Sequence, residues 1–320
     1  MHWPDIPYER WKDTGASLHM WSQIAGKFRL AYAPWQNHSW HATFYVTARG
    51  LSSSAVHTHG SSYEVLFDFL DHRLVVQCAS GAEAGFALEP MSVAAFHQKF
   101  TAALESVGAP TRFHGSPNEV PDPVPFLQQT TPGAYDPQAA HDYWCALRAM
   151  FPVFSQFRAE FLGKSSPVHL FWGSFDLAVT RFSGRPAPLH PGGFPALPDA
   201  VTQEAYSHEV SSAGFWPGGG GIDEAAFYSY AYPVPEGFST VHVTPAAAHF
   251  HDALGEFILP YDAVRRSSTP EADLLSFLRS TYAVAADLAS WDRAALDRPE
   301  GVLGKPPPLK QQRAPQSRRP

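Results

Sequence analysis

The sequence has few of the features that identify a reaction or a compartment directly. It holds only two cysteines in 320 residues, Cys78 and Cys145, so it contains no C-x-x-C pair for zinc or redox chemistry and allows one disulfide at most. No segment approaches eighteen consecutive apolar residues, and the first residues lack the charged start and apolar run of a signal peptide. We therefore expect a soluble, cytoplasmic protein with no membrane partner.

Common nucleotide and nucleophile motifs are also absent. The sequence contains no P-loop, no dinucleotide fingerprint and no nucleophile elbow. The glycine run at 217–221 is followed by neither Lys-Ser nor Lys-Thr, which argues against a phosphate cradle. We interpret this run as a mobile lip over a pocket or as a long hairpin turn.

Charge is scarce and mostly negative. Charged residues make up 17% of the chain, and the formal net charge is −7. Residues 299–320 hold five bases and one acid, which leaves a net charge of −11 for the rest of the chain. An acidic body repels nucleic acid and anionic membranes, so we expect neither as a partner. The segment 299–320 is basic and rich in proline, and we expect it to be a disordered tail.

Hydrophobic residues reach 44% of the chain and aromatic residues 14%, which is enough for a large core and for rings that line a pocket. Apolar spacing of three and four residues predicts helices, and runs rich in Val, Phe, Tyr and Leu predict strands. The predicted helices cover 8–31, 92–107, 138–162 and 270–289, and the predicted strands cover 43–51, 63–70, 73–78, 86–88, 168–182, 206–215, 225–232 and 256–259.

The same order of elements occurs twice along the chain. Each half starts with a helix, continues with strands and ends with a helix, and FALEPMSVAAF at 86–96 resembles EFILPYDAV at 256–264. VTARG at 46–50 also aligns loosely with VTRFSG at 179–184. We predict an α+β fold, in which a duplicated helix–antiparallel-strands–helix module forms one pseudo-symmetric globular unit. The predicted parts are a first module at 1–108, a proline-rich connection at 109–137, a second module at 138–298 that carries the site, and the tail at 299–320.

The segment 168–182 concentrates polar side chains in what the sequence predicts to be a strand. Because side chains alternate between faces, Trp172, Ser174, Asp176 and Thr180 would share one face. That mixture suits the floor of a pocket or a water-lined groove. The alternative is a half-exposed strand whose polar face meets solvent.

The next strand, 206–215, would place Tyr206 and His208 on one face and Glu209 on the other. Glu204 would end a short helix that starts near residue 199. On one continuous helix, Glu204 and His208 would form a metal-binding or acid–base pair, but the predicted strand separates them. Structural hydrogen bonding is the default interpretation of this spacing.

Two arginines and several histidines complete the candidates. Arg181 and Arg185 flank a Ser-Gly turn, which suits a carboxylate or phosphate group and equally suits salt bridges to Asp176, Glu204 or Glu209. His190 lies in a proline–glycine loop from which it could reach a site. His249 and His251 form a His-x-His pair of the kind that binds metals, and Asp252 and Glu256 could assist them if the segment turns helically.

Several segments carry a resemblance to a known family. They include WKDTGASLHMWSQIAGKFRL, YVTARGL, FDFLDHRL, SPVHLFWGSFDLAVTRFSGRPAP, EAYSHEVSSAGFWPGG, GEFILPY and STYAVAADLASWDR. From Trp3 to about Leu296, the chain resembles the DUF5996 family of uncharacterised bacterial proteins. The resemblance implies membership but no reaction. Ser39 and His249 depart from the family pattern, and the departure at His249 weakens the His-x-His metal hypothesis, whereas His251 fits the pattern.

We rank three functional hypotheses. The first is an enzyme that acts on a small polar molecule in a pocket lined by His, Glu and Trp, with assistance from a divalent metal ion as one version. The second is a non-catalytic protein that binds a small ligand, and the third is a structural protein with a buried polar network. Convergence of the candidates on one cavity favours chemistry, whereas dispersion favours a structural role. The catalytic candidates are His208, Glu209, Glu204 and Asp176; the substrate-binding candidates are Trp172, Arg181, Arg185, Tyr206 and Trp216; the metal-ligand candidates are His169, His208 and His251.

Overall fold

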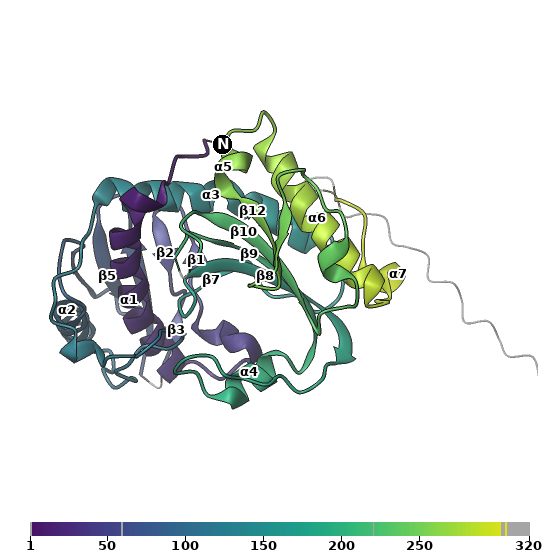
Figure 1. Cartoon of the computed structure of the whole chain (residues 1–320). Helices are drawn as coiled ribbons and strands as arrows, with labels where there is room; N and C mark the ends of the chain where they lie inside the picture. Colours follow the sequence, from purple (N-terminus) through teal and green to yellow (C-terminus); the bar gives the residue numbers. More distant parts are fainter. Residues whose placement is uncertain (1, 59, 220, 302–304, 306–320) are drawn as a thin grey trace, which may run out of the picture.

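The computed structural model describes residues 2–58, 60–219, 221–301 and 305, which form two antiparallel sheets with several helices (Figure 1). The predicted α+β class and the antiparallel strands are confirmed. Most of the predicted tail at 299–320 lies outside the described residues. Within the described part of the chain, no helix has the length and apolar character needed to span a membrane.

The first sheet is built from the first third of the chain. Its strand order is β1-β2-β4-β5-β6, and β3 pairs with β4. Helix α1 precedes this sheet in the chain and helix α2 follows it. The elements are α1 (Tyr8–Tyr32), η1 (Asn37–Ala42), β1 (Tyr45–Val46), β2 (Gly50–Ser52), β3 (Val56–His57), β4 (Ser62–Asp68), β5 (Arg73–Cys78), β6 (Glu83–Ala87) and α2 (Val93–Ser106).

The second sheet follows a proline-rich connection that contains the short helix η2 (Phe126–Gln128). Its strand order is β7-β8-β9-β10-β12-β11. Helix α3 precedes the sheet in the chain and α6 follows it. The elements are α3 (Pro137–Ala159), β7 (His169–Phe171), β8 (Asp176–Pro186), α4 (Asp199–Ala205), β9 (His208–Trp216), β10 (Ala226–Tyr232), η3 (Phe238–Thr240), β11 (His249–His251), β12 (Glu256–Pro260), α5 (Tyr261–Arg265), α6 (Pro270–Leu288) and α7 (Arg293–Leu296).

The four long helices lie where their apolar spacing predicts them. Helix α2 begins after Ser92, whose hydroxyl caps the helix by accepting a hydrogen bond from the Ala95 amide at 3.1 Å. Two predicted strands are wrong, however. Residues 43–51 and 168–182 each form a hairpin, β1–β2 and β7–β8, instead of one continuous strand. A run of apolar residues does not reveal a reversal when the turn itself carries buried aromatic residues such as Trp172 and Phe175.

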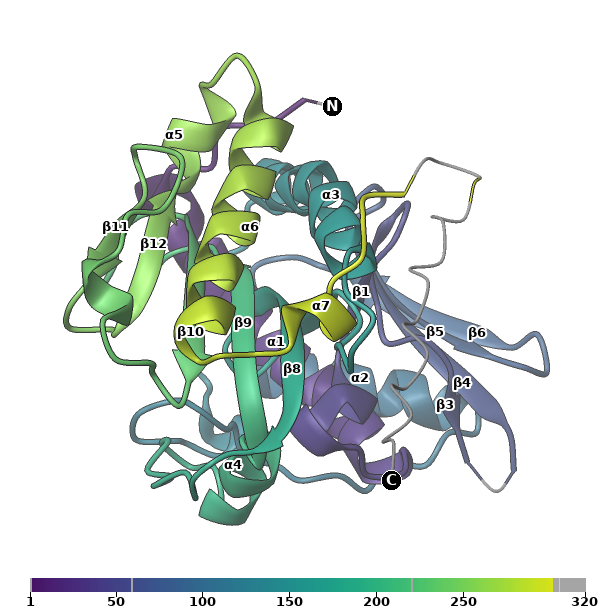
Figure 2. The same ribbon diagram turned by 90° about the vertical axis from the view of Figure 1, so that its right-hand side faces the viewer.

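Aromatic rings join the helices to both sheets. In the first half, the ring of Phe96 on α2 stacks on Trp21 of α1 at 5.1 Å and on Phe67 of β4 at 6.1 Å between centroids. In the second half, Phe154 of α3 packs on Phe227 of β10, and α6 crosses β9 and β10 (Figure 2). The buried side chains of both halves form one continuous core.

The two sheets also touch through their edge strands. Phe44 and Leu170 form an antiparallel bridge in which each amide donates to the other carbonyl, at 2.9 and 2.8 Å. This bridge places the start of β1 beside β7. As a result, η1, which immediately precedes β1, lies next to the second sheet.

Strand β8 shows how the second sheet divides its faces. Leu177, Val179 and Arg181 alternate with Asp176 and Thr180. The first set faces the helices, where the Arg181 guanidinium lies over the ring of Phe157 from α3. The second set faces away from the helices, and that face forms the floor of the cavity.

Candidate functional site

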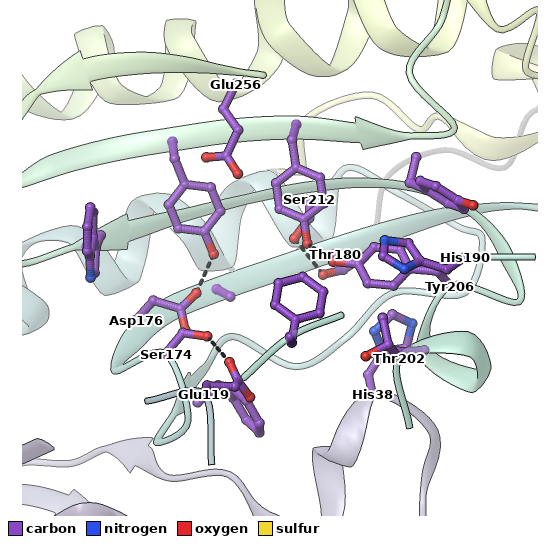
Figure 3. A pocket seen from close by; sticks show the side chains of 18 of the residues that line it. His38, Glu119, Ser174, Asp176, Thr180, His190, Thr202, Tyr206, Ser212 and Glu256 are labelled. Carbon is purple, nitrogen blue, oxygen red and sulfur yellow. Dashed lines mark hydrogen bonds between the residues drawn. The ribbon is translucent and has the colours of Figure 1, made fainter. Parts of the chain in front are cut away.

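A cavity of about 540 Å³ covers the face of the second sheet that the helices leave open (Figure 3). Its floor comes from β7, β8, β9, β10 and β12, and its walls come from η1, the proline-rich connection, the loop at 187–198 and helix α4. A volume of this size accommodates a small organic molecule.

The alternation of β10 supplies a row of phenols to this floor. Tyr228, Tyr230 and Tyr232 line the cavity, and the residues between them, Ser229 and Ala231, are small and buried. The hydroxyl of Tyr230 shares a hydrogen bond of 2.7 Å with that of Tyr206. Burial raises the pKa of Tyr206 to about 12 and that of Tyr228 further, so these phenols stay neutral at physiological pH.

A glycine lets one of these phenols reach a carboxylate two strands away. Tyr228 on β10 pairs with Gly214 on β9, which pairs with Ala178 on β8. A Cβ atom at Gly214 would lie 2.4 Å from the Tyr228 hydroxyl and 2.5 Å from the Leu177 carbonyl oxygen. Because that space is free, the phenol crosses β9 and donates a hydrogen bond to Asp176.

Three carboxyl groups from separate segments line this cavity. Asp176 starts β8, Glu256 starts β12, and Glu119 comes from the proline-rich connection. Burial raises the pKa of Asp176 to about 6, an effect that the Tyr228 hydrogen bond limits. Burial and the nearby charge of Asp176 raise the pKa values of Glu119 and Glu256 to about 7, although a 2.6 Å hydrogen bond from Ser174 opposes the shift at Glu119. All three carboxyls therefore titrate near neutrality.

The position of Glu119 depends on helix α1, which belongs to the first half of the chain. Gln23 of α1 accepts from the Asn118 amide at 2.8 Å and donates to the Asn118 carbonyl at 2.8 Å. The Lys27 ammonium, one turn further along α1, donates to the Asn118 side chain. The Glu119 amide in turn donates to the carbonyl of Pro195 in the loop at 187–198, at 2.8 Å. The backbone beside Glu119 is thus held from both sides.

Three imidazoles in the cavity are held neutral. Burial lowers the pKa of His38 to about 3 and that of His169 to about 4, and it also lowers the pKa of His190. His169 donates through Nδ1 to the Pro167 carbonyl at 2.8 Å, so its Nε2 is an acceptor. The Nε2 of His38 is buried and has no hydrogen-bond partner among the described residues. His38 has a φ of 57°, a strained left-handed backbone on the cavity wall.

The mouth of the cavity is apolar. Phe194 from the loop at 187–198, Val234 after β10 and Leu254 before β12 all line the cavity and are exposed large hydrophobic side chains. Leu189, next to the cavity residue His190, is 76% exposed. Large apolar side chains gathered at one opening are typical of a surface that contacts a ligand.

Four of the residues predicted from the sequence lie in the cavity: Asp176, Tyr206, Trp216 and His169. Ser174, Asp176 and Thr180 form part of its lining, as the pocket-floor interpretation of this segment expects. His190, predicted to be able to reach a site, also lines the cavity. Glu256, proposed as an assistant to the His249–His251 pair, lines the cavity without either histidine.

Two predicted substrate-binding residues serve the core instead. Trp172 lies in the β7–β8 turn, where its indole donates to the Ala42 carbonyl at 2.5 Å and covers Gly26 of α1. Arg181 lies on the opposite face of β8 and is enclosed by the rings of Phe157, Phe161 and Tyr282. Neither side chain lines the cavity: Trp172 lies in the turn that reverses the chain between β7 and β8, and Arg181 alternates with the cavity residues Asp176 and Thr180 on β8.

The remaining predicted residues lie outside the cavity too. Arg185 and Glu209 form a surface ion pair at 2.7 Å, one of the salt bridges that the sequence allows as the alternative. Glu204 accepts from the Trp35 indole at 2.5 Å, and His208 is exposed. His251 accepts from the Leu254 amide at 3.3 Å in the turn after β11.

The predicted metal ligands are not brought together. His169 lines the cavity, whereas His208 and His251 do not. Across the described ranges, no group of three or more His, Cys, Asp or Glu side chains is arranged to hold a metal ion. The His-x-His pair does lie on a strand, β11, but without the further ligands that a metal site requires.

Sequence reasoning missed Glu119, His38 and the phenols of β10. The alternation in AFYSYAY at 226–232 was a signal for the phenols, since every second residue is a tyrosine. Glu119 and His38 had no comparable signal, because each lies in a segment without periodic pattern and reaches the cavity only through tertiary contacts.

The model of a family described as a family of unknown function, DUF5996, matches residues 3–298. The chain belongs to this family. Searches for similar curated proteins and for similar solved structures give no match to this DUF5996 chain.

Proposed function

We propose that the chain is an enzyme that acts on a small polar molecule in the cavity of the second sheet, by general acid–base catalysis. The observation that supports this most is the group of three carboxyls, Asp176, Glu119 and Glu256, whose pKa values lie near neutrality. Groups that titrate near the working pH exchange protons efficiently, and perturbed pKa values gather at active sites.

The pKa values suggest a division of roles. Between pH of about 6 and about 7, Asp176 is mostly ionised, whereas Glu119 and Glu256 are mostly protonated. Asp176 would then remove a proton from the bound molecule, and one of the glutamic acids would return a proton elsewhere on it. The phenol of Tyr228 would keep Asp176 oriented, and the rings around the cavity would hold the molecule and exclude water.

The test measures consumption of small molecules. Purified protein is incubated with a metabolite extract, and mass spectrometry follows which compounds disappear over time. We expect the wild-type chain, but not Asp176→Asn or Glu119→Gln, to consume a compound, with a rate maximum between pH of about 6 and about 7. The matched control is Glu105→Gln, an exposed glutamate on α2. Equal rates for wild type and both carboxamide variants would refute the proposal.

The second candidate is a protein that binds a small ligand without turnover. The aromatic lining of the cavity favours it, since rings with a few polar groups are typical of ligand pockets. Enrichment of a compound on the protein without any consumption identifies this function. The third candidate, a structural network, predicts that loss of Asp176 destabilises the fold.

We also propose that the two sheets arose by duplication and are related by a pseudo-twofold axis. Both sheets have six antiparallel strands and lie between two long helices in the chain. Both begin with a hairpin whose innermost strand pair encloses four residues: Val46 and Leu51 enclose 47–50, and Phe171 and Asp176 enclose 172–175. Matching these turns makes Phe44 equivalent to His169 and Tyr45 equivalent to Leu170. The bridge between Phe44 and Leu170 then joins the equivalent edge strands of the two sheets, which is what a twofold axis passing between β1 and β7 requires.

We also propose a cytoplasmic location, which the two unpaired cysteines support.

A further inference from the structure

The charges around the cavity all have one sign. The described residues that line it include the carboxyls of Glu119, Asp176 and Glu256 but no lysine or arginine. The nearest ammonium groups are engaged elsewhere: Lys27 with the Asn118 side chain, and Lys164 over the ring of Phe182 at 4.4 Å. A ligand that enters therefore meets anionic and neutral groups only.

The charged hydrogen-bonding groups of the lining also favour a cationic ligand. The Tyr228 hydroxyl donates to Asp176, and the Ser174 hydroxyl donates to Glu119. Thr180 and Ser212 share one hydrogen bond at 2.9 Å, as the phenols of Tyr206 and Tyr230 do. Each shared bond uses only one of its two hydroxyl hydrogens, and the Thr202 hydroxyl in the lining has no partner among the described residues. His190 accepts the Gly192 amide at Nδ1, so its Nε2 carries the hydrogen, whereas the three carboxyls and the Nε2 of His169 are acceptors. The described lining therefore offers uncharged donors but no charged donor for an anionic ligand, whereas its three carboxyls can accept from a cationic, donor-rich one.

Glu256 is the clearest case of an unused acceptor. Its carboxyl points toward the space beside the phenols of β10 (Figure 3). Within the described part of the chain, no hydrogen bond or ion pair reaches this carboxyl, although it is largely removed from solvent. A buried carboxylate without a partner is unfavourable, so a cation placed beside it gains both a charge interaction and a hydrogen bond.

We propose that the ligand of this cavity is an organic cation: a protonated amine carried on an apolar arm. The ammonium group would lie among Glu256, Asp176 and Glu119, and its N–H groups would donate to the carboxylates. The rings of Tyr206, Trp216 and their neighbours would surround it with electron-rich faces that attract cations. The apolar arm would lie against the mouth, beside Phe194, Val234 and Leu254. This inference rests on the cavity being the functional site, but it requires no turnover.

Binding should strengthen as the pH rises from about 5 to about 8. Each carboxyl that ionises adds an attractive charge, and each imidazole or ammonium that loses its proton removes a repulsive one, so all the titrating groups act in the same direction. The groups that face this region are the carboxyls of Glu119, Asp176 and Glu256, the imidazoles of His38, His169 and His190, the phenols of Tyr206, Tyr228, Tyr230 and Tyr232, and the ammonium groups of Lys27 and Lys164 behind the walls.

Two matched series of probes test the proposal. One contains hexylamine, hexan-1-ol and hexanoate, and the other contains phenethylamine, 2-phenylethanol and 3-phenylpropanoate, so that within each series the apolar arm stays similar while the charge changes. Thermal unfolding of the full chain gives the first readout, and titration calorimetry gives Kd. We expect the amines to raise Tm and to bind at least about tenfold more tightly than the alcohols and acids.

Variants locate the effect. Glu256→Gln should weaken amine binding by about tenfold or more, whereas the charge-matched surface variant Glu105→Gln should leave Kd unchanged. If Glu256→Gln fails to fold, Glu119→Gln provides the same comparison from another segment. Alcohols or acids that bind as well as the amines, or amines that give no shift in either series, would overturn the proposal.

The outcome is separable from that of the catalytic proposal. Amine binding that depends on Glu256, without consumption of any compound, keeps this inference and removes catalysis. Consumption of a neutral or anionic compound that depends on Asp176 keeps the catalytic proposal and removes this one.

Discussion

Replacement of Asp176 by asparagine should stabilise the protein, although Asp176 is nearly buried and hydrogen-bonded. The residue is only 8% exposed, and burial raises the pKa of its carboxyl from 3.8 to about 6. A carboxyl whose pKa is higher in the folded state binds protons on folding. It therefore makes the fold less stable as the pH rises from its unfolded pKa to its folded pKa. Asparagine keeps the shape without the charge.

The magnitude follows from the shift. One pKa unit corresponds to about 1.4 kcal/mol, so the full penalty of the ionised carboxylate is about 3 kcal/mol above pH of about 7. At pH 5 the Asp176 carboxyl is largely ionised in the unfolded chain but still mostly protonated in the folded protein. The penalty on the free energy of unfolding at this pH is therefore about 1.5 kcal/mol. The stabilisation by Asp176→Asn should therefore roughly double between these pH values.

Denaturant unfolding at several pH values measures the free energy of unfolding of the wild type and of Asp176→Asn. Asp68 provides a control for which the same substitution should lower the free energy of unfolding. Asp68 is also buried, but hydrogen bonds from Arg49 at 2.6 Å and from two amides outweigh the effect of burial and lower its pKa. Asp68→Asn should therefore destabilise the protein above the unfolded pKa of the carboxyl, and this loss should fade as the pH falls through the folded pKa. If Asp176→Asn destabilises the protein at pH 8, Asp176 serves the fold and the reasoning about the site is refuted.

Three further substitutions give separate checks. Gly214→Ala should displace the Tyr228 phenol from Asp176 and so raise the pKa of that carboxyl, because a donor to its charged form is lost. NMR titration of the carboxyl carbon measures this pKa, and an unchanged value would contradict the contact between Tyr228 and Asp176. Trp172→Ala should lower the free energy of unfolding by about 3–5 kcal/mol, since it empties the space between α1 and the β7–β8 turn, and a loss below about 1 kcal/mol in denaturant unfolding would argue against that packing. Arg185→Ala should change stability by no more than about 1 kcal/mol and leave amine binding unchanged, because its ion pair lies on the surface, and a large change in Kd by calorimetry would reinstate it as a ligand-binding residue.

The sequence allowed most of the elements to be predicted where local patterns decide them. The spacing of Trp11, Leu18, Trp21 and Phe28 predicts α1, and the Ser92 cap predicts the start of α2. The alternation after Asp176 predicts a polar face on β8 for the same reason, since strand geometry alone places every second side chain together.

Reversals of the chain were not predictable in the same way. The segment around Gly173 is rich in apolar residues on both sides, so its pattern fits one long strand as well as a hairpin. Only the pairing of Phe171 with Asp176 shows that the chain turns there, and this turn assigns Trp172 to the core and Asp176 to the cavity. The predicted shared face of Trp172 and Asp176 failed for this reason, whereas Arg181 lies opposite Asp176, as alternation within β8 requires.

By itself, the sequence determined an α+β chain with antiparallel strands, an acidic body and a polar face on β8, because periodicity and composition act locally. Only the tertiary structure brought Glu119 from the proline-rich connection and His38 from η1 onto the second sheet beside Asp176 and Glu256. No local pattern encodes that convergence. It arises because α1 holds Asn118, and because the bridge between Phe44 and Leu170 places η1 against the second sheet.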